Sequence, residues 1–147
     1  MVVCNGIERA IDYFFAIKKL LAQRNSAYKA IIAFSGTKEY GEHSYDEAQL
    51  NQFPSSKIEK TFNTDGYRFL IVADKFQTGY DNKLLHTMYV DKTLSDIKAV
   101  QTISRLNRVH PLKKDTYVLD LVNQPEDIEK AFRKYYKHTS VSHETDI

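Results

Sequence analysis

The chain has 147 residues, of which 42% are hydrophobic and 27% are charged, and its formal net charge is +2. This length fits one domain with a sizeable core, the charge is too small to predict nucleic-acid binding by itself, and no apolar run approaches the ~20 residues that span a membrane. The single Cys4 excludes an internal disulfide and argues against a structural zinc site, so we expect it to be a small buried hydrophobic residue.

The first third of the chain alternates strand and helix patterns. Val2–Cys4 is a short apolar run that predicts a strand. Across Ile7–Leu21 apolar residues recur every three or four positions, which predicts an amphipathic helix of about 16 residues. Lys29–Phe34 predicts a second strand that ends at Ser35-Gly36, and we expect the polar stretch Thr37–Ser44 to be a loop.

The middle of the chain predicts two short helices and a buried strand. The helices are expected at Asp46–Gln52 and Ser55–Asn63, with Pro54 between them. The run Arg68–Ala73 is too apolar to have one face in water, which is typical of a central strand in a parallel sheet. The polar segment Asp74–Asp81 is the loop that follows this strand.

The last third predicts two more strands, at His86–Val90 and Thr116–Leu121. The helix between these strands contains Gln101–Arg108. A final helix is expected over Pro125–Tyr136, because proline and acidic residues both suit the first turn of a helix. The polar end, Thr139–Ile147, is expected to be a linker or a frayed terminus.

This alternation of strands and helices predicts an α/β fold, with a mostly parallel sheet of about five strands covered on both faces. In such sheets the functional residues lie on loops beyond the carboxyl ends of the strands. Three segments satisfy that rule: Ser35–Thr37, Asp74–Asp81 and the segment before the helix that contains Gln101. We expect these three segments to meet at one edge of the sheet.

One face of the Gln101–Arg108 helix carries two arginines and an amide. At about 100° per residue, Gln101, Arg105 and Arg108 fall within roughly 60° of one another, and Leu106 lies on the opposite side. Two guanidinium groups one turn apart suit the oxygens of a phosphate. Neither arginine has an acidic residue three or four positions away. The same pattern also fits a solvated cationic face, so spacing alone leaves both interpretations open.

Three segments carry a family resemblance. Ala73–Asp81 contains a Thr-Gly-x-Asp sequence and resembles motif V of superfamily 2 helicases and translocases. Gln101–Arg108 resembles motif VI of the same superfamily, which usually reads Gln-x-x-Gly-Arg-x-x-Arg. Together with Leu84–Lys92, these residues are most similar to the R (restriction and motor) subunit of type I restriction enzymes.

The resemblance extends from about Met1 to about Tyr136, and it is more specific after Arg68 than before it. Ser104 stands where the wider superfamily has glycine, and close R-subunit sequences also carry serine there. The resemblance implies a RecA-like, three-layer α/β/α domain over residues 1–138, the second of two motor domains in such a subunit, with residues 139–147 as a linker or frayed end.

The resemblance also implies ligands and partners. The full-length enzyme would use ATP and Mg²⁺, whereas this fragment is expected to hold neither. The implied partners are double-stranded DNA, the first motor domain and the nuclease domain of the same subunit, and the methyltransferase and specificity subunits, with no membrane contact. The implied location is the cytoplasm of a bacterium or an archaeon.

Motif VI implies catalytic roles for two arginines. Arg108 would be the arginine finger that stabilises the charge on the transferring γ-phosphoryl group of ATP, and Arg105 would be its companion. Gln101 would orient or sense the nucleotide through its amide. As an alternative, one of these arginines could pair with a carboxylate such as Asp81 and serve as a structural clamp.

Motif V implies that Thr78 contacts the DNA strand and that Gly79 and Asp81 couple this contact to the nucleotide. A glycine lets backbone N–H groups approach a phosphate closely. Asp81 could instead accept a ribose hydroxyl, hold a motif VI arginine, or cap a turn. Ser35 and Gly36 also follow a strand, and a weaker similarity to motif IV implies that they contact a DNA phosphate; a plain turn is the alternative.

Several motifs of a complete motor or nuclease are absent from the sequence. The chain has no Gly-x-x-x-x-Gly-Lys-Ser/Thr (Walker A) loop, no Asp-Glu-x-x motif after a strand that could hold Mg²⁺, and no Asp…Glu-x-Lys nuclease set. We identify no metal-ligating residues. The chain would therefore supply half of an ATP site within an ATP-dependent type I site-specific deoxyribonuclease, and the isolated fragment is predicted to have no ATPase, translocase or nuclease activity.

Two other interpretations remain open. The chain could be the second motor domain of another superfamily 2 DNA translocase, although Ser104 argues against it. It could also be a non-enzymatic doubly wound domain that binds a nucleotide or a partner. A solvent-facing Arg105 and Arg108 would favour a motor, whereas an arginine pair buried against Asp81 and Asp74, with no cleft, would favour a binding module.

Overall fold

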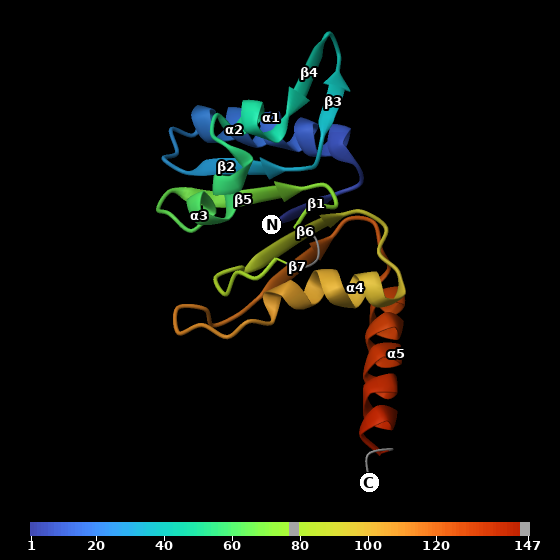
Figure 1. The fold of residues 1–147 in the computed structure, drawn as a ribbon. Coiled ribbons are helices and arrows are strands. Elements are labelled where there is room, and N and C mark those ends of the chain that lie inside the picture. Colours follow the sequence, from blue (N-terminus) through green and yellow to red (C-terminus); the bar gives the residue numbers. More distant parts are fainter. Residues whose placement is uncertain (77–79, 145–147) are drawn as a thin grey trace. The chain divides into compact units, whose positions relative to one another are not determined.

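A computed structural model describes the backbone of residues 1–76 and 80–144, and the side chains of residues 1–76 and 80–137. The chain divides into two compact units, Met1–Gln77 and Thr78–Ile147 (Figure 1). The boundary between the units falls inside the segment Asp74–Asp81.

The first unit contains three parallel strands and a separate hairpin. Its strands run in the order β2-β5-β1, with Ile32 and Val2 both in register with Ile71 of β5. The elements are β1 (Val2–Cys4), α1 (Ile7–Gln23), β2 (Lys29–Ala33), β3 (Thr37–Tyr40), β4 (His43–Asp46), α2 (Glu47–Asn51), the 3₁₀ turn η1 (Ser55–Lys57), α3 (Ile58–Phe62) and β5 (Tyr67–Val72).

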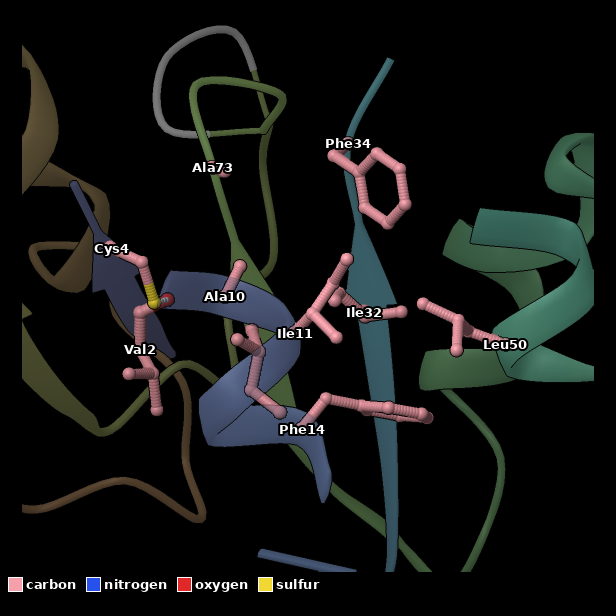
Figure 2. Packing of buried hydrophobic residues seen from close by; sticks show 10 residues of the cluster. Val2, Cys4, Ala10, Ile11, Phe14, Ile32, Phe34, Leu50 and Ala73 are labelled. Atoms are coloured by element: carbon pink, nitrogen blue, oxygen red, sulfur yellow. Dashed lines mark hydrogen bonds between the residues drawn. The ribbon is translucent and has the colours of Figure 1, made fainter. Parts of the chain in front are cut away.

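The apolar face of α1 covers one side of these strands. Ala10, Ile11 and Phe14 recur at helical spacing and are buried, and Figure 2 shows them facing Ile32 of β2 and Leu50 of α2. Helix α3 contacts β5 and β2 as well, so strands that are apolar on both faces have helices packed on them. The predicted length and position of α1 are therefore confirmed.

The first strand supplies its own part of this core. Cys4 is fully buried in the same cluster, which confirms that it is a small core residue.

The loop prediction for Thr37–Ser44 is wrong. Strands β3 and β4 form an antiparallel hairpin with Tyr40 opposite His43, and Gly41 in the turn has a φ of +62°. A positive φ at the first turn residue suits the twist of a two-residue hairpin. Tyr40 and Tyr45 place their rings 5.8 and 6.0 Å from the ring of Phe15 on α1, so aromatic contacts hold this otherwise polar hairpin.

The second unit is a strand–helix–strand element followed by a long helix. It contains β6 (Thr87–Asp91), α4 (Asp96–Ile103), the 3₁₀ turn η2 (Ser104–Leu106), β7 (Tyr117–Asp120) and α5 (Pro125–Glu144). Strands β6 and β7 are parallel neighbours, with Met88 paired to Val118. The three parallel strands of the first unit, the two of the second and the helices beside them confirm the predicted α/β, RecA-like fold class.

Helix α5 begins at Pro125 as predicted but continues to Glu144, beyond the expected end at Tyr136. The polar composition that suggested a linker is also typical of an exposed helix, because polarity alone does not end a helix. Among the described residues, no helix is both long and apolar enough to cross a membrane.

Candidate nucleotide and DNA site

Two of the three predicted loops meet at one edge of the first unit. Strands β2 and β5 are parallel with Ala33 opposite Val72, and Ala73 N–H donates to the Ala33 carbonyl at 3.2 Å. The segments after these strands, which begin at Ser35 and Asp74, therefore start side by side. This confirms the predicted convergence for these two loops.

Ser35 and Gly36 are both exposed at this edge. Gly36 has a φ of +79°, and apart from its chain neighbours no atom of the described residues lies within 4 Å of the position that a Cβ would take. The backbone there is consequently open to a large ligand.

A buried carboxylate connects the two loops. Glu47, the first residue of α2, is 4% exposed and accepts a hydrogen bond from Phe34 N–H at 2.8 Å, while its other carboxylate oxygen pairs with Lys75 Nζ. No motif or spacing in the sequence indicates a role for Glu47. Because α2 starts with a capping box between Asp46 and Gln49, the position of Glu47 is fixed by local structure.

The loop that contains Lys75 has an unusual backbone. Asp74 and Phe76 have φ values of +64° and +63°, a region that residues other than glycine rarely adopt. Such conformations cost on the order of 1–3 kcal/mol each and persist where surrounding contacts impose them. The pairing of Lys75 with Glu47 lies between these two residues and is one such contact.

Thr78 and Gly79 of the predicted motif V lie outside the described residues. Asp81, which follows them, belongs to the second unit, and the structure places it beside the motif VI segment.

The motif VI segment is less helical than predicted. Helix α4 ends at Ile103, the 3₁₀ turn η2 ends at Leu106, and Arg108 lies beyond both. Proline disfavours helical geometry in the residue before it, so Pro111 limits any continuation through His110. The prediction of one continuous helix over Gln101–Arg108 is therefore wrong at its carboxyl end.

Lys113 forms hydrogen bonds at the carboxyl end of the motif VI segment. Its Nζ donates to the main-chain carbonyls of Leu106 at 2.9 Å and Leu85 at 3.1 Å. Carbonyls in the last turn of a helix lack intrahelical partners, and the lysine supplies one for Leu106. Desolvation lowers the pKa of Lys113 from its ordinary value. The sequence pattern gives no signal for this contact, because it depends on the return of the chain after Pro111.

Arg105 contacts the motif V side of the second unit. One terminal guanidinium nitrogen, Nη1, donates to the Tyr80 carbonyl at 3.1 Å. Its Nε is buried and has no hydrogen-bond partner in the part of the chain that the structure describes. A buried donor without an acceptor raises the free energy of the folded state. An acceptor that reached this nitrogen, such as a phosphate oxygen, would remove that cost.

Arg108 pairs with Asp81. The Nε of Arg108 lies 2.9 Å from Oδ1 of Asp81, and the two side chains are 54% and 52% exposed. This contact agrees with the possibility that Asp81 holds a motif VI arginine. It does not bury either group, so the guanidinium remains accessible to a ligand.

An open groove of about 520 Å³ brings the predicted nucleotide-binding side chains of motif VI together. Nine residues from α4, η2, the segment after η2 and α5 line it: Ile97, Val100, Gln101, Ser104, Arg105, Asn107, Arg108, Tyr135 and Tyr136. Two guanidinium groups, amides and a hydroxyl on one wall can bind phosphate oxygens, and the aliphatic and tyrosine side chains can contact a flat apolar group.

The two tyrosines of the groove are partly exposed. Tyr135 is 41% exposed and Tyr136 is 55% exposed, so both rings can contact a ligand. The described residues contain no group of three or more His, Cys, Asp or Glu side chains placed to hold a metal ion.

Comparison with known proteins identifies the family. Residues 37–121, more than half of the chain, match the family described as type I restriction enzyme subunit R domain 3. The chain belongs to this family. The match includes β3 to β7 and therefore both Asp81 and the motif VI segment.

Several relatives are named as endonuclease subunits of type I restriction enzymes. A protein of Methanocaldococcus jannaschii, whose name refers to the endonuclease subunit of the type I restriction enzyme MjaIXP, is 27% identical over the whole chain. The SauCOLORF180P endonuclease subunit of Staphylococcus aureus is 29% identical over 77% of the chain, and the HindI endonuclease subunit of Haemophilus influenzae is 28% identical over 71%. The chain spans only 14%, 12% and 10% of the lengths of these three relatives.

Proposed function

We propose that the chain is the second RecA-like motor domain of a type I restriction enzyme R subunit, where it completes an ATP site and contacts the DNA backbone. The family membership and the clustering of Gln101, Arg105 and Arg108 on one groove support this proposal. The rest of the ATP site, the nuclease activity and the other subunits would come from outside this chain.

The observation that carries the proposal is the state of the two arginines. Arg105 has a buried Nε without an acceptor among the described residues, and the guanidinium of Arg108 is half-exposed on the same groove. During ATP hydrolysis negative charge spreads over the γ-phosphoryl oxygens, and an arginine from a facing domain stabilises it. We assign Arg108 to this role, Arg105 to the same phosphate oxygens, and Gln101 to orientation of the nucleotide.

The contacts of the arginines also suggest how nucleotide and DNA are coupled. Arg105 binds the Tyr80 carbonyl and Arg108 binds Asp81, and both of these residues directly follow the proposed DNA-contacting Thr78 and Gly79. A change in the arginine positions on ATP binding would therefore be transmitted to the segment that holds the DNA. Repeated changes of this kind would translocate double-stranded DNA.

Ser35 and Gly36 would add a second contact to the DNA backbone. Their exposure and the open backbone at Gly36 fit a phosphate group. With ATP bound, Mg²⁺ would supply charge neutralisation on the phosphates. The described residues offer no ligand cluster for it, so its protein ligands would belong to the first motor domain.

The geometry bears on the two alternatives. A binding module was expected to bury the arginines against Asp81 and Asp74 without a cleft. In the structure Arg108 pairs with Asp81 in a half-exposed contact, beside an open groove. This arrangement favours a motor over a binding module. Another superfamily 2 translocase is less well supported, because the family match names the type I enzyme.

The test compares DNA-stimulated ATP hydrolysis of the full-length protein that carries this chain with that of its Arg108→Ala variant. Removal of an arginine finger is expected to lower the maximal rate by about 10³- to 10⁵-fold while ATP still binds. Arg133→Ala is the matched control, because Arg133 is also an exposed, ion-paired arginine, with Glu129 as its partner. Equal rates for the parent and Arg108→Ala would refute the motor assignment.

A further inference from the structure

Two side chains of α2 form hydrogen bonds with the backbone at the edge of β2. Asn51 accepts from Ile32 N–H at 2.9 Å and donates to the Ile32 carbonyl at 2.8 Å, while Glu47 accepts from Phe34 N–H at 2.8 Å. Glu47 and Asn51 are one turn apart on α2, a rise of about 6 Å, and Ile32 and Phe34 are two residues apart on the strand, about 6.6 Å. Because these distances match, side chains of α2 can form hydrogen bonds with the backbone groups that β2 leaves unpaired at its edge.

Among the described residues, only one of these two side chains has a second partner, on the loop that follows β5. Glu47 also pairs with Lys75, between the two residues with positive φ, Asp74 and Phe76. The Glu47 side chain is 5% exposed, whereas the Lys75 side chain is 27% exposed. A carboxylate is rarely buried to this extent unless it is paired, and hydrogen bonds to an ionised group are stronger than those to a neutral one.

We propose that Glu47 is a positioning residue for DNA binding, which fixes the loops that begin at Ser35 and at Asp74 relative to each other. One carboxylate oxygen holds Phe34, directly before Ser35, and the other holds Lys75, directly after Asp74. A DNA strand has a fixed spacing between phosphates, so two loops that bind it together must keep a fixed separation. The inference rests on the proposed function, since it assumes that these loops contact DNA.

The first experiment uses the full-length protein and its Glu47→Gln variant. The amide oxygen of glutamine can still accept from Phe34 N–H, but the charge that holds Lys75 is lost. We expect the DNA concentration that gives half-maximal ATPase stimulation to rise by about 2- to 30-fold, with little change in the maximal rate. Lys75→Gln should give the same shift, and the double variant should give no larger one, because the two residues act as a pair.

Asn51→Ala is the matched control for a merely structural role. It removes two hydrogen bonds from the same helix to the same strand, but Asn51 has no contact with Lys75 among the described residues. Its shift in DNA half-saturation is expected to be additive with that of Lys75→Gln. Equal shifts for Asn51→Ala and Glu47→Gln, or additivity of Glu47→Gln with Lys75→Gln, would overturn the inference.

A second measurement separates this inference from the proposed function. Amide hydrogen exchange is expected to increase in both residues 33–37 and residues 73–76 in Glu47→Gln, and only in the first segment in Asn51→Ala. Unchanged amide exchange in residues 73–76 of Glu47→Gln would overturn the inference. If the parent shows no DNA-stimulated ATPase, the proposed function fails and the DNA-positioning role fails with it, but the exchange data still decide whether Glu47 links the loops.

Discussion

The ion pair between Arg108 and Asp81 gives a prediction that separates catalysis from structure. Asp81→Asn removes the charge of the partner and leaves the guanidinium of Arg108 in place. Both side chains are about half-exposed, at 54% and 52%, so water screens their attraction. Exposed pairs of this kind contribute about 0.2–1 kcal/mol to stability. The free energy of unfolding should therefore fall by no more than about 1 kcal/mol in Asp81→Asn.

The expected catalytic effects are of a different size. A finger contribution of about 10³- to 10⁵-fold corresponds to about 4–7 kcal/mol of transition-state stabilisation, several times the energy of the ion pair. If Arg108 acts directly on the phosphate, Asp81→Asn should lower the ATPase rate far less than Arg108→Ala. If Arg108 acts only as a clamp on Asp81, the two variants should lower the rate equally.

The assay is a double-mutant cycle on the full-length protein, with DNA-stimulated ATP hydrolysis measured for the parent, the two single variants and the double variant. Urea unfolding of the 147-residue chain gives the stability of each form. Equal losses of rate in Asp81→Asn and Arg108→Ala, with no further loss in the double variant, would refute a direct role for Arg108.

Two further predictions concern the first unit. Phe14→Ala should lower the free energy of unfolding by about 3–5 kcal/mol, because Phe14 is only 1% exposed. Phe15→Ala is the control, because Phe15 is 38% exposed. Equal losses of unfolding free energy in the two variants, measured by urea unfolding, would contradict the core assignment of Phe14. The Tyr40 hydroxyl donates to Asp12, and this bond raises the pKa of Tyr40 above its ordinary value of 10.0. Because the pKa of Tyr40 is higher in the folded state than in the unfolded state, the bond stabilises the fold at pH values below the ordinary pKa. This stabilisation is lost as pH rises through the folded-state pKa. The difference in unfolding free energy between the parent and Tyr40→Phe should therefore shrink above about pH 10. A constant difference across that range would show that the bond does not affect the titration.

Local patterns in the sequence were sufficient for the elements whose stability comes from their own spacing. The apolar positions of α1, including Ala10, Ile11 and Phe14, predicted its length to within about one residue. Apolar runs predicted β1, β2 and β5, because a strand covered on both faces is continuously apolar, and β7 was predicted although most of its residues are exposed. The first residue of α5 was predicted from Pro125, whose ring suits the first turn of a helix.

The failures of prediction involve contacts between distant residues. The β3–β4 hairpin depends on Tyr40 and Tyr45 contacting Phe15, and nothing in the polar segment itself indicates this packing. Glu47 and Lys75 are separated by 28 positions, so no spacing rule connects them. The motif VI segment leaves helical geometry after Leu106, and a helical projection extended through Arg108 could not show this.

The grouping of Gln101, Arg105 and Arg108 was nevertheless predicted correctly, although its geometric basis was partly wrong. A 3₁₀ turn has three residues per turn, so it changes the direction of each side chain only gradually from that of an α-helix. Arg105 therefore stays on the face of Gln101, and Arg108, beyond the 3₁₀ turn, lines the same groove. The resemblance to motif VI indicated the same three residues by a separate route.

The weakness of the Arg108–Asp81 pair is itself an argument for ligand exchange at this site. An exposed ion pair contributes about 0.2–1 kcal/mol, whereas a hydrogen bond from a charged donor to a well-placed anion contributes about 1.5–3 kcal/mol, and a guanidinium can make two of them to one phosphate. A phosphate entering the groove would therefore replace Asp81 as the partner of Arg108 at little cost. Arg105 would gain in the same step, since its buried Nε has no acceptor among the described residues. An arginine clamp with a purely structural role would instead be expected to have a buried ion pair and a partner for every donor. Here the ion pair is half-exposed and the Nε of Arg105 has no acceptor among the described residues.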